Sequence, residues 1–198
     1  MGAATDRYQA RLGISREDQD AVAAESHARA AAAIKEGRLA GEIFPVTVPG
    51  RKGEVTVEDD EGVRPGITPE RLGLPWLAEI GSYGTVAGPD PSLLHQPANA
   101  IRDAFRRDGT LDVRDLDLIE INEAFAGVVL ASTRDLGLAP DRVNVNGGAI
   151  ALGHPVGMSG ARLVLTLALE LRRRGGGTGA AALCGGGGQG DALILRVR

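Results

Sequence analysis

Hydrophobic residues recur along this chain with two different spacings. Beyond residue 76, short β-prone apolar runs alternate with longer stretches of helical spacing. The runs predict extended segments or strands over 77–82, 116–121, 143–146, 178–184 and 191–197, and the longer stretches predict helices over 97–107, 123–136 and 159–174. Strands that alternate with helices of this length indicate an α/β layer. The last two strands are joined by glycines without a helix, which predicts an antiparallel pair.

The first 75 residues have a different pattern. Ser15 has the character of a helix N-cap, and the alanine-rich run 21–34 predicts a helix that ends at Gly37. Two β-prone runs, 43–48 and 54–58, flank a turn at 49–53 and predict a hairpin. Residues 59–74 are acidic and then rich in Gly and Pro, which is typical of a connector. We therefore expect two parts, a helix-and-hairpin appendage at 1–75 and an α/β domain at 76–198.

Composition narrows the classes of partner. The formal net charge is −4 at pH 7, with acidic and basic residues interspersed, so we expect no nucleic-acid or membrane partner. The apolar stretches are too short to cross a bilayer, and residues 1–9 lack the pattern of a signal peptide, which favours a cytoplasmic location. One cysteine cannot form an internal disulfide, and three scattered histidines predict no metal site.

Three residues lie where strands are predicted to end. Asn122 follows one strand, His154 lies in a glycine-lined turn before Pro155, and Cys184 ends an apolar run that leads into Gly185-Gly186-Gly187-Gly188-Gln189-Gly190. Sites in open α/β sheets gather at such strand ends, so these residues are candidates for one crevice. Each also has an ordinary interpretation: a helix cap for Asn122, a turn-capping role for the histidine, and simple packing for the thiol. The glycine run is either a plain connection or a source of N–H donors for an oxyanion.

Taken together, the motifs resemble the C-terminal half of thiolases. The matching segments are Asn122-Glu123-Ala124-Phe125, NVNGGAIALGHPVG at 144–157 and CGGGGQG at 184–190. GISREDQD at 13–20 and GRKG at 50–53 are similar to the middle of a thiolase chain. The resemblance implies a thiolase-like C-terminal domain, a mixed sheet with helices on both faces, after a partial N-terminal helix and hairpin. It covers only about the second half of the family's length.

The resemblance also implies a function. Thiolases transfer acyl groups between coenzyme A thioesters, with CoA thioesters as substrates and no permanently bound cofactor. It implies that His154 activates a nucleophile, that Cys184 shuttles a proton, and that Asn122 and Gly186 serve two oxyanion holes. Phe125 matches a contact to the pantetheine arm of CoA. An imidazole, a thiol and N–H donors suit proton removal beside a thioester carbonyl.

Two departures from the family pattern limit this expectation. The only cysteine matches the proton-shuttling one, so the acyl-carrying nucleophile has no counterpart in these residues. A strand-forming stretch that thiolases carry is missing between about residues 73 and 74. Three hypotheses follow. The chain is one part of a split thiolase that works with a complementary N-terminal domain chain, or it is an inactive thiolase-fold module for CoA binding or assembly. The third is a lesser enzyme that exchanges protons on a bound acyl-CoA or hydrolyses it slowly. An apolar face left bare predicts self-association or a partner chain.

Overall fold

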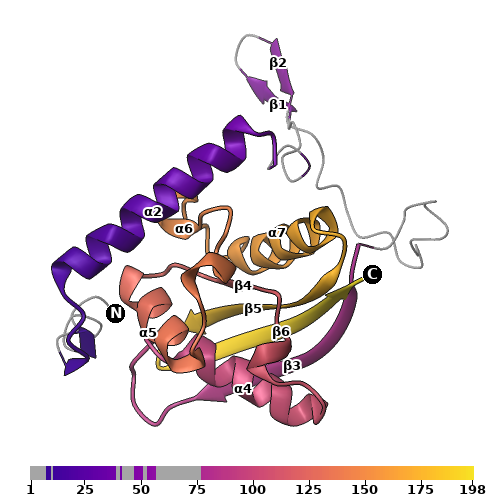
Figure 1. Cartoon of the computed structure of the whole chain (residues 1–198). Helices are drawn as coiled ribbons and strands as arrows, with labels where there is room; N and C mark the ends of the chain where they lie inside the picture. Colours follow the sequence, from indigo (N-terminus) through magenta and orange to yellow (C-terminus); the bar gives the residue numbers. More distant parts are fainter. Residues whose placement is uncertain (1–7, 10, 39–40, 42–46, 51–52, 57–76) are drawn as a thin grey trace.

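The structure is a computed structural model of residues 1–198 in which residues 8–9, 11–38, 41, 47–50, 53–56 and 77–198 are described. Figure 1 shows a twisted sheet with helices above and below it, and a long N-terminal helix across one end. Among the described residues, none of the helices is both long and apolar enough to cross a membrane.

The central sheet contains the four strands β3 (Glu79–Ala87), β4 (Leu118–Ile121), β5 (Gly177–Gly185) and β6 (Gln189–Val197), in the order β3-β6-β5-β4. The β4 and β5 strands are parallel, whereas β6 is antiparallel to both of its neighbours. The predicted antiparallel pairing of the last two strands is therefore confirmed. Because β4 and β5 run in the same direction, their carboxyl ends lie at the same edge of the sheet.

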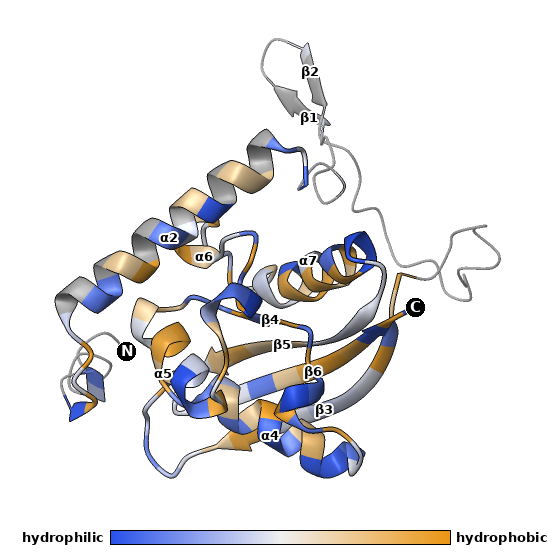
Figure 2. Cartoon of the chain, viewed as in Figure 1, coloured by the Kyte–Doolittle hydropathy of each residue, from blue (hydrophilic) through white to orange (hydrophobic). Residues whose placement is uncertain are grey.

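Helices cover both faces of the sheet. The helices α4 (Gln96–Asp108) and α5 (Ala126–Leu136) pack on one face, and α7 (Ser159–Arg173) packs on the other. Strand β5 alternates accordingly, because Ala180 and Ala182 belong to the core on the α4 side and Ala181 to the core on the α7 side. Figure 2 shows the resulting hydrophobic strands between the helices. The fold class, a mixed sheet with helices on both faces, is confirmed.

The N-terminal segment begins with the helix α2 (Arg16–Lys35). Ser15 caps it, because the Asp18 N–H donates to Ser15 Oγ at 3.0 Å and the Ser15 N–H donates to Asp18 Oδ2 at 3.1 Å. Helix α2 lies against α5 and the short helix α6 (Ala149–Leu152). The strands β1 (Thr47–Gly50) and β2 (Gly53–Thr56) form the predicted antiparallel hairpin. Predicted strand residues 43–46 and 57–58, and the connector at 59–74, lie outside the described residues.

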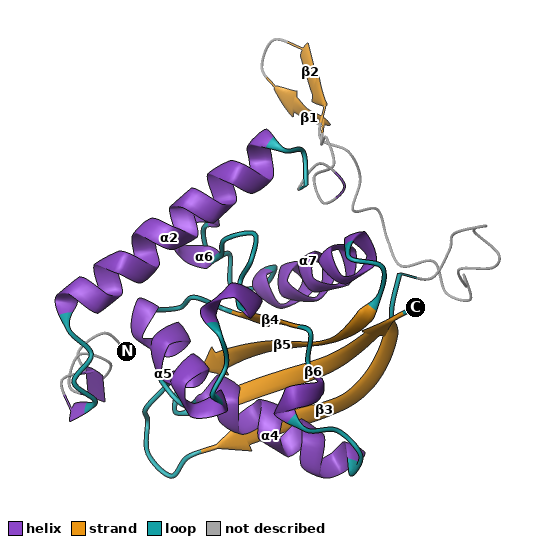
Figure 3. Cartoon of the chain, in the orientation of Figure 1, coloured by secondary structure: helices purple, strands orange, loops and turns teal. Residues whose placement is uncertain are grey.

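Local details differ from the expectation in the loops that Figure 3 shows in teal. Helix α5 begins at Ala126 rather than 123, because the chain first makes a tight turn in which the Ala124 N–H donates to the Asn122 carbonyl at 2.9 Å. The predicted strand at 143–146 is irregular backbone with two isolated bridges, from Val143 to Ile119 and from Val145 to Gly147. The extended segment predicted at 77–82 is instead β3, over Glu79–Ala87. Helix α6 and the 3-10 turns η2 (Val113–Asp115) and η3 (Pro140–Arg142) were not predicted.

Candidate active site

Asn122 lies directly beyond the carboxyl end of β4. Its N–H donates to the Ala182 carbonyl at 2.9 Å, which continues the ladder between β4 and β5 by one residue. The side chain is completely buried, and its Nδ2 lies 3.3 Å from His154 Nε2. The expectation that Asn122 caps the next helix is wrong, because Phe125 occupies the N-cap position of α5. The buried amide instead faces an imidazole that lies 32 residues away in the chain.

His154 lies in the loop between α6 and α7. Gly153 precedes it with φ 90°, a conformation that favours glycine. The imidazole Nδ1 lies 2.6 Å from Ser159 Oγ, and this hydroxyl donates to the Pro155 carbonyl at 3.0 Å. A serine hydroxyl has one hydrogen, so Nδ1 carries the proton that bridges to Ser159. The lone pair of Nε2 then accepts from the Asn122 amide, and this ring nitrogen is the basic one.

Cys184 lies near the end of β5, paired with Gly190 on β6. Its side chain packs on the α4 and α5 side of the sheet, in the same core cluster as Phe125. Burial raises the pKa of the Cys184 thiol to about 11. Desolvation is the main cause of this shift. Among the described residues, no hydrogen bond joins the thiol to His154, so a shared thiol–imidazole pocket stays a prediction.

The glycine loop between β5 and β6 is fixed in place by contacts of its last glycine, Gly188. Gly186 opens the turn, and Gly188 closes it with φ 78°. The Gly188 carbonyl accepts from the Gly88 N–H at 2.9 Å and from Gln96 Nε2 at 2.6 Å. A Cβ atom on Gly188 would lie 2.1 Å from the Asp90 carbonyl oxygen, so only glycine fits there. Packing explains this end of the glycine run, and an oxyanion role for the Gly186 N–H stays a prediction.

Glu123 is the residue that the sequence interpretation missed. Expected in the first turn of a helix, its carboxylate is instead buried and accepts three hydrogen bonds: from Ser26 Oγ at 2.6 Å, from Asn144 Nδ2 at 3.0 Å and from the Ile150 N–H at 3.0 Å. A Cβ atom on Gly148 would lie 2.3 Å from Glu123 Cδ, so the backbone approaches the carboxylate closely. These bonds join three separate segments immediately beside Asn122.

Asn144 completes this framework from the other side. It is the one described non-glycine residue with positive φ, at 47°. Its Oδ1 accepts from the Ile121 N–H at 2.7 Å, and its Nδ2 donates to the Ile121 carbonyl at 2.8 Å. The side chain thus pairs with the end of β4 as another strand would. The asparagine-rich repeat NVN at 144–146 was the available signal, but its partner could not be identified from sequence spacing.

The fold is that of an α/β protein. The buried Asn122 amide and the His154 imidazole meet where β4 ends, and together they form a candidate acid/base site. The family model for the thiolase C-terminal domain matches residues 74–197, and the model for the thiolase N-terminal domain matches residues 1–102. The chain belongs to the thiolase family. The likeness therefore reaches both domain models and is not limited to the C-terminal one.

Several curated relatives are similar to this chain over nearly all its length. "Probable acetyl-CoA acetyltransferase" of Mycolicibacterium smegmatis is 49% identical over 236 aligned positions, covering 99% of this chain and 61% of the relative. Acetyl-CoA acetyltransferase of Paracoccus denitrificans is 41% identical, covering 98% and 60%. The crystal structure of the Bacillus anthracis acetyl-CoA acetyltransferase is 35% identical with a TM-score of 0.84, covering 98% and 59%. The chain thus spans about 60% of the length of these relatives.

The alignment with the Mycolicibacterium protein contains more positions than the 198 residues of this chain. That relative therefore carries residues with no counterpart here. This agrees with a missing internal stretch, whose location near residue 73 stays a prediction.

Proposed function

We propose that this chain takes part in thiolase-type acyl transfer between coenzyme A thioesters. The reaction is either cleavage of a 3-oxoacyl-CoA by CoA or the reverse condensation of two acyl-CoA molecules. The observation that carries the proposal is the contact between Asn122 and His154, which unites two of the three family motifs at one edge of the sheet. Membership of the thiolase family supports the same reaction class.

His154 is proposed to act as base and then as hydrogen-bond donor. With Nδ1 held as a donor by Ser159, the lone pair of Nε2 exchanges the hydrogen bond from Asn122 for the proton of a nucleophilic thiol. The protonated Nε2 then donates toward the oxygen of the thioester, where negative charge develops. The Asn122 amide, already directed at the same ring nitrogen, is proposed to hold a water that donates to this oxygen.

Cys184 is proposed to move the proton of the second substrate, with the Gly186 N–H stabilising the other oxyanion and Phe125 touching the pantetheine arm of CoA. The Cys184 thiol can transfer this proton only if its surroundings change so that its pKa falls. At a pKa of about 11, only about one thiol in ten thousand is ionised at pH 7. A nearby imidazolium would lower that pKa, because an opposite charge favours the thiolate.

A second polypeptide is proposed to supply the acyl-carrying cysteine, because Cys184 is the only cysteine of this chain. An apolar hollow on the α7 side of the sheet supports such a partner. It measures about 290 Å³, and Tyr83, Val164, Leu183 and Leu193 are among its lining residues. Tyr83 is 57% exposed there. The proposed occupant is a complementary thiolase N-terminal domain chain, and self-association is the alternative.

Mixing this chain with a separately purified thiolase N-terminal domain tests the proposal. We expect thiolysis of acetoacetyl-CoA only when both polypeptides are present. The loss of ultraviolet absorbance by acetoacetyl-CoA measures this reaction. His154→Ala should lower that rate by at least about a hundredfold, the low end for a general base. Arg172→Gln, an exposed change on α7, is the matched control. Equal rates for His154→Ala and the control would exclude the proposed role of the imidazole.

A CoA-binding or assembly module without turnover is the second candidate. The buried, protonated state of the Cys184 thiol favours it. Isothermal titration with CoA should then give a dissociation constant of about 1 mM or tighter, near 4 kcal/mol, and Phe125→Ala should weaken binding. Deuterium uptake into acetyl-CoA separates this candidate from a lesser enzyme. Uptake that is equal in wild type and in His154→Ala would rule out proton exchange by this site.

A further inference from the structure

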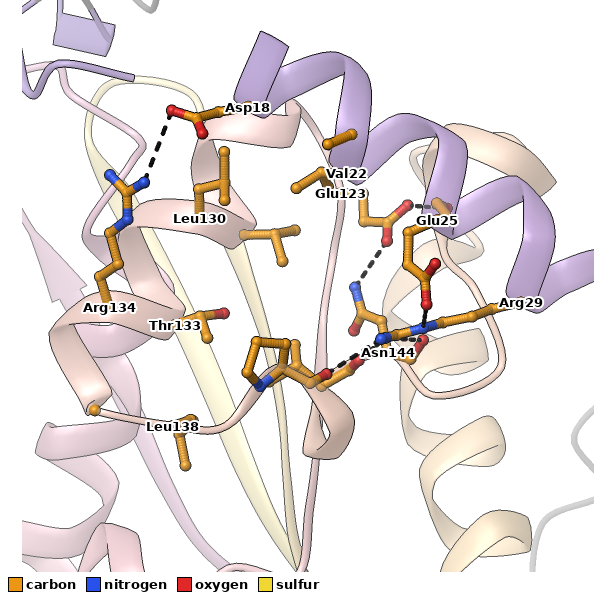
Figure 4. A pocket seen from close by; sticks show the side chains of 16 residues that line it. Asp18, Val22, Glu25, Arg29, Glu123, Leu130, Thr133, Arg134, Leu138 and Asn144 are labelled. Atoms are coloured by element: carbon orange, nitrogen blue, oxygen red, sulfur yellow. Dashed lines mark hydrogen bonds and ion pairs between the residues drawn. The ribbon is translucent and has the colours of Figure 1, made fainter. Parts of the chain in front are cut away.

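A separate hollow lies between the N-terminal helix α2 and helix α5. It has a volume of about 440 Å³, within the usual range of roughly 300–1,000 Å³ for small-molecule sites. Figure 4 shows Val22 of α2 facing Leu130 of α5 across it, with Leu138 at the far end. The remaining apolar wall consists of Ala21, Val129, Pro140 and Val143. Asn122, His154 and Cys184 do not line this hollow, although Glu123 and Asn144 of the neighbouring framework do, so an occupant here would not touch the proposed catalytic side chains.

The charged side chains deep in the hollow already have partners. Glu123 accepts three hydrogen bonds, as described above. Arg29 donates to Glu25 at 2.8 Å and to the Val143 carbonyl at 2.5 Å. An occupant therefore does not have to neutralise a charge inside, and a polar occupant would meet mostly apolar wall. The interior favours an aliphatic body.

The mouth of the hollow has a different character. Arg134 Nη2 lies 3.8 Å from Asp18 Oδ2, beyond hydrogen-bonding distance, and the arginine side chain is 55% exposed. Asp18 Oδ2 also accepts from the Ser15 N–H, so the carboxylate is engaged in the helix cap. Among the described residues, no acceptor is hydrogen-bonded to the Arg134 guanidinium. This group can bind a carboxylate with two parallel hydrogen bonds.

We propose that this hollow binds an aliphatic carboxylate of medium chain length. The hydrocarbon tail lies between α2 and α5, and the carboxylate binds Arg134 at the mouth. Binding here does not depend on the proposed acyl transfer, because it uses neither His154 nor Cys184.

Isothermal titration of the full chain with decanoate tests the proposal, with decanol as the uncharged analogue. We expect saturable decanoate binding with a dissociation constant below 1 mM. Val22→Phe, which fills the hollow, should weaken decanoate binding at least tenfold. Arg134→Gln should weaken it about threefold to fivefold, as expected for a half-exposed ion pair, and leave decanol binding unchanged. Arg172→Gln removes one exposed charge elsewhere and should change neither affinity.

Circular dichroism of Val22→Phe must match wild type, and if α2 is disturbed, Leu130→Phe fills the same hollow from α5. No saturable decanoate binding at millimolar concentration would overturn the proposal. Undiminished binding to the filled variant would place the ligand elsewhere, for example on the apolar hollow beside α7, and would also overturn it. An equal loss of decanol and decanoate binding in Arg134→Gln would refute the role of the carboxylate.

Discussion

Replacement of Ser26 by alanine should lower the free energy of unfolding by more than is usual for a substitution in a helix at the surface. The Ser26 side chain is buried on α2, which packs against α5 and α6. Its hydroxyl donates to Glu123 Oε2 at 2.6 Å and accepts from the Gly148 N–H at 3.2 Å. Alanine removes both bonds and offers no substitute, since both partners are buried.

The magnitude follows from the two groups left behind. A hydrogen bond to a charged acceptor contributes about 1.5–3 kcal/mol, and an unsatisfied buried N–H costs about 1–3 kcal/mol. The two losses share one site and are not independent, so we expect about 2–4 kcal/mol in total. Typical domains have only about 5–15 kcal/mol of stability, so this one hydroxyl would account for a large share.

Urea denaturation followed by circular dichroism measures the effect. Ser82→Ala is the matched control, because the Ser82 hydroxyl is buried without a hydrogen-bond partner among the described residues and its removal should be nearly neutral. Hydrogen exchange of α2 amides should rise in Ser26→Ala, because this helix loses one of its polar attachments to the loops that follow β4 and precede α6. If Ser26→Ala and Ser82→Ala unfold at the same urea concentration, the hydrogen bonds of Ser26 to Glu123 and Gly148 do not stabilise the fold and the reasoning is wrong.

Two further predictions concern titration. The rate of Cys184 alkylation by iodoacetamide should rise about tenfold per pH unit past pH 9 and level off only near the thiol pKa of about 11. A plateau of this rate near pH 8 would contradict burial of the thiol. Hydrogen bonds from Arg106 and Arg107 lower the pKa of Asp103 to about 2, so its stabilising effect is complete above about pH 4 and disappears as the pH falls toward 2. Asp103→Asn should thus lower the urea midpoint near pH 6 but not near pH 2, and an equal difference at both pH values would refute this.

Local features of the fold could be predicted because they depend on neighbouring residues. The cap formed by Ser15 and Asp18 uses groups three residues apart. Gly109 ends α4 in the left-handed conformation with φ 75°, as glycine permits at low cost. The alternation of apolar residues in β5 likewise follows from the two-residue period of a strand. Each of these signals is complete within a few positions of the chain.

The candidate site was predictable only in part. Its residues Asn122, His154 and Cys184 could be chosen because each follows a predicted strand or lies in a glycine-rich turn. The tertiary structure decided that Asn122 faces His154 rather than capping α5, and that Glu123 binds a serine 97 residues earlier in the chain.

The sequence by itself determined the long helices, most of the strands, the fold class and the motifs of a thiolase. Only the tertiary structure decided which buried polar groups meet and how far each is removed from water. A thiol in an open glycine turn and a thiol packed against the core on the α4 side have the same sequence around them, yet burial raises the pKa of Cys184 to about 11. Desolvation depends on every atom that surrounds a group, and most of those atoms belong to residues distant in the chain.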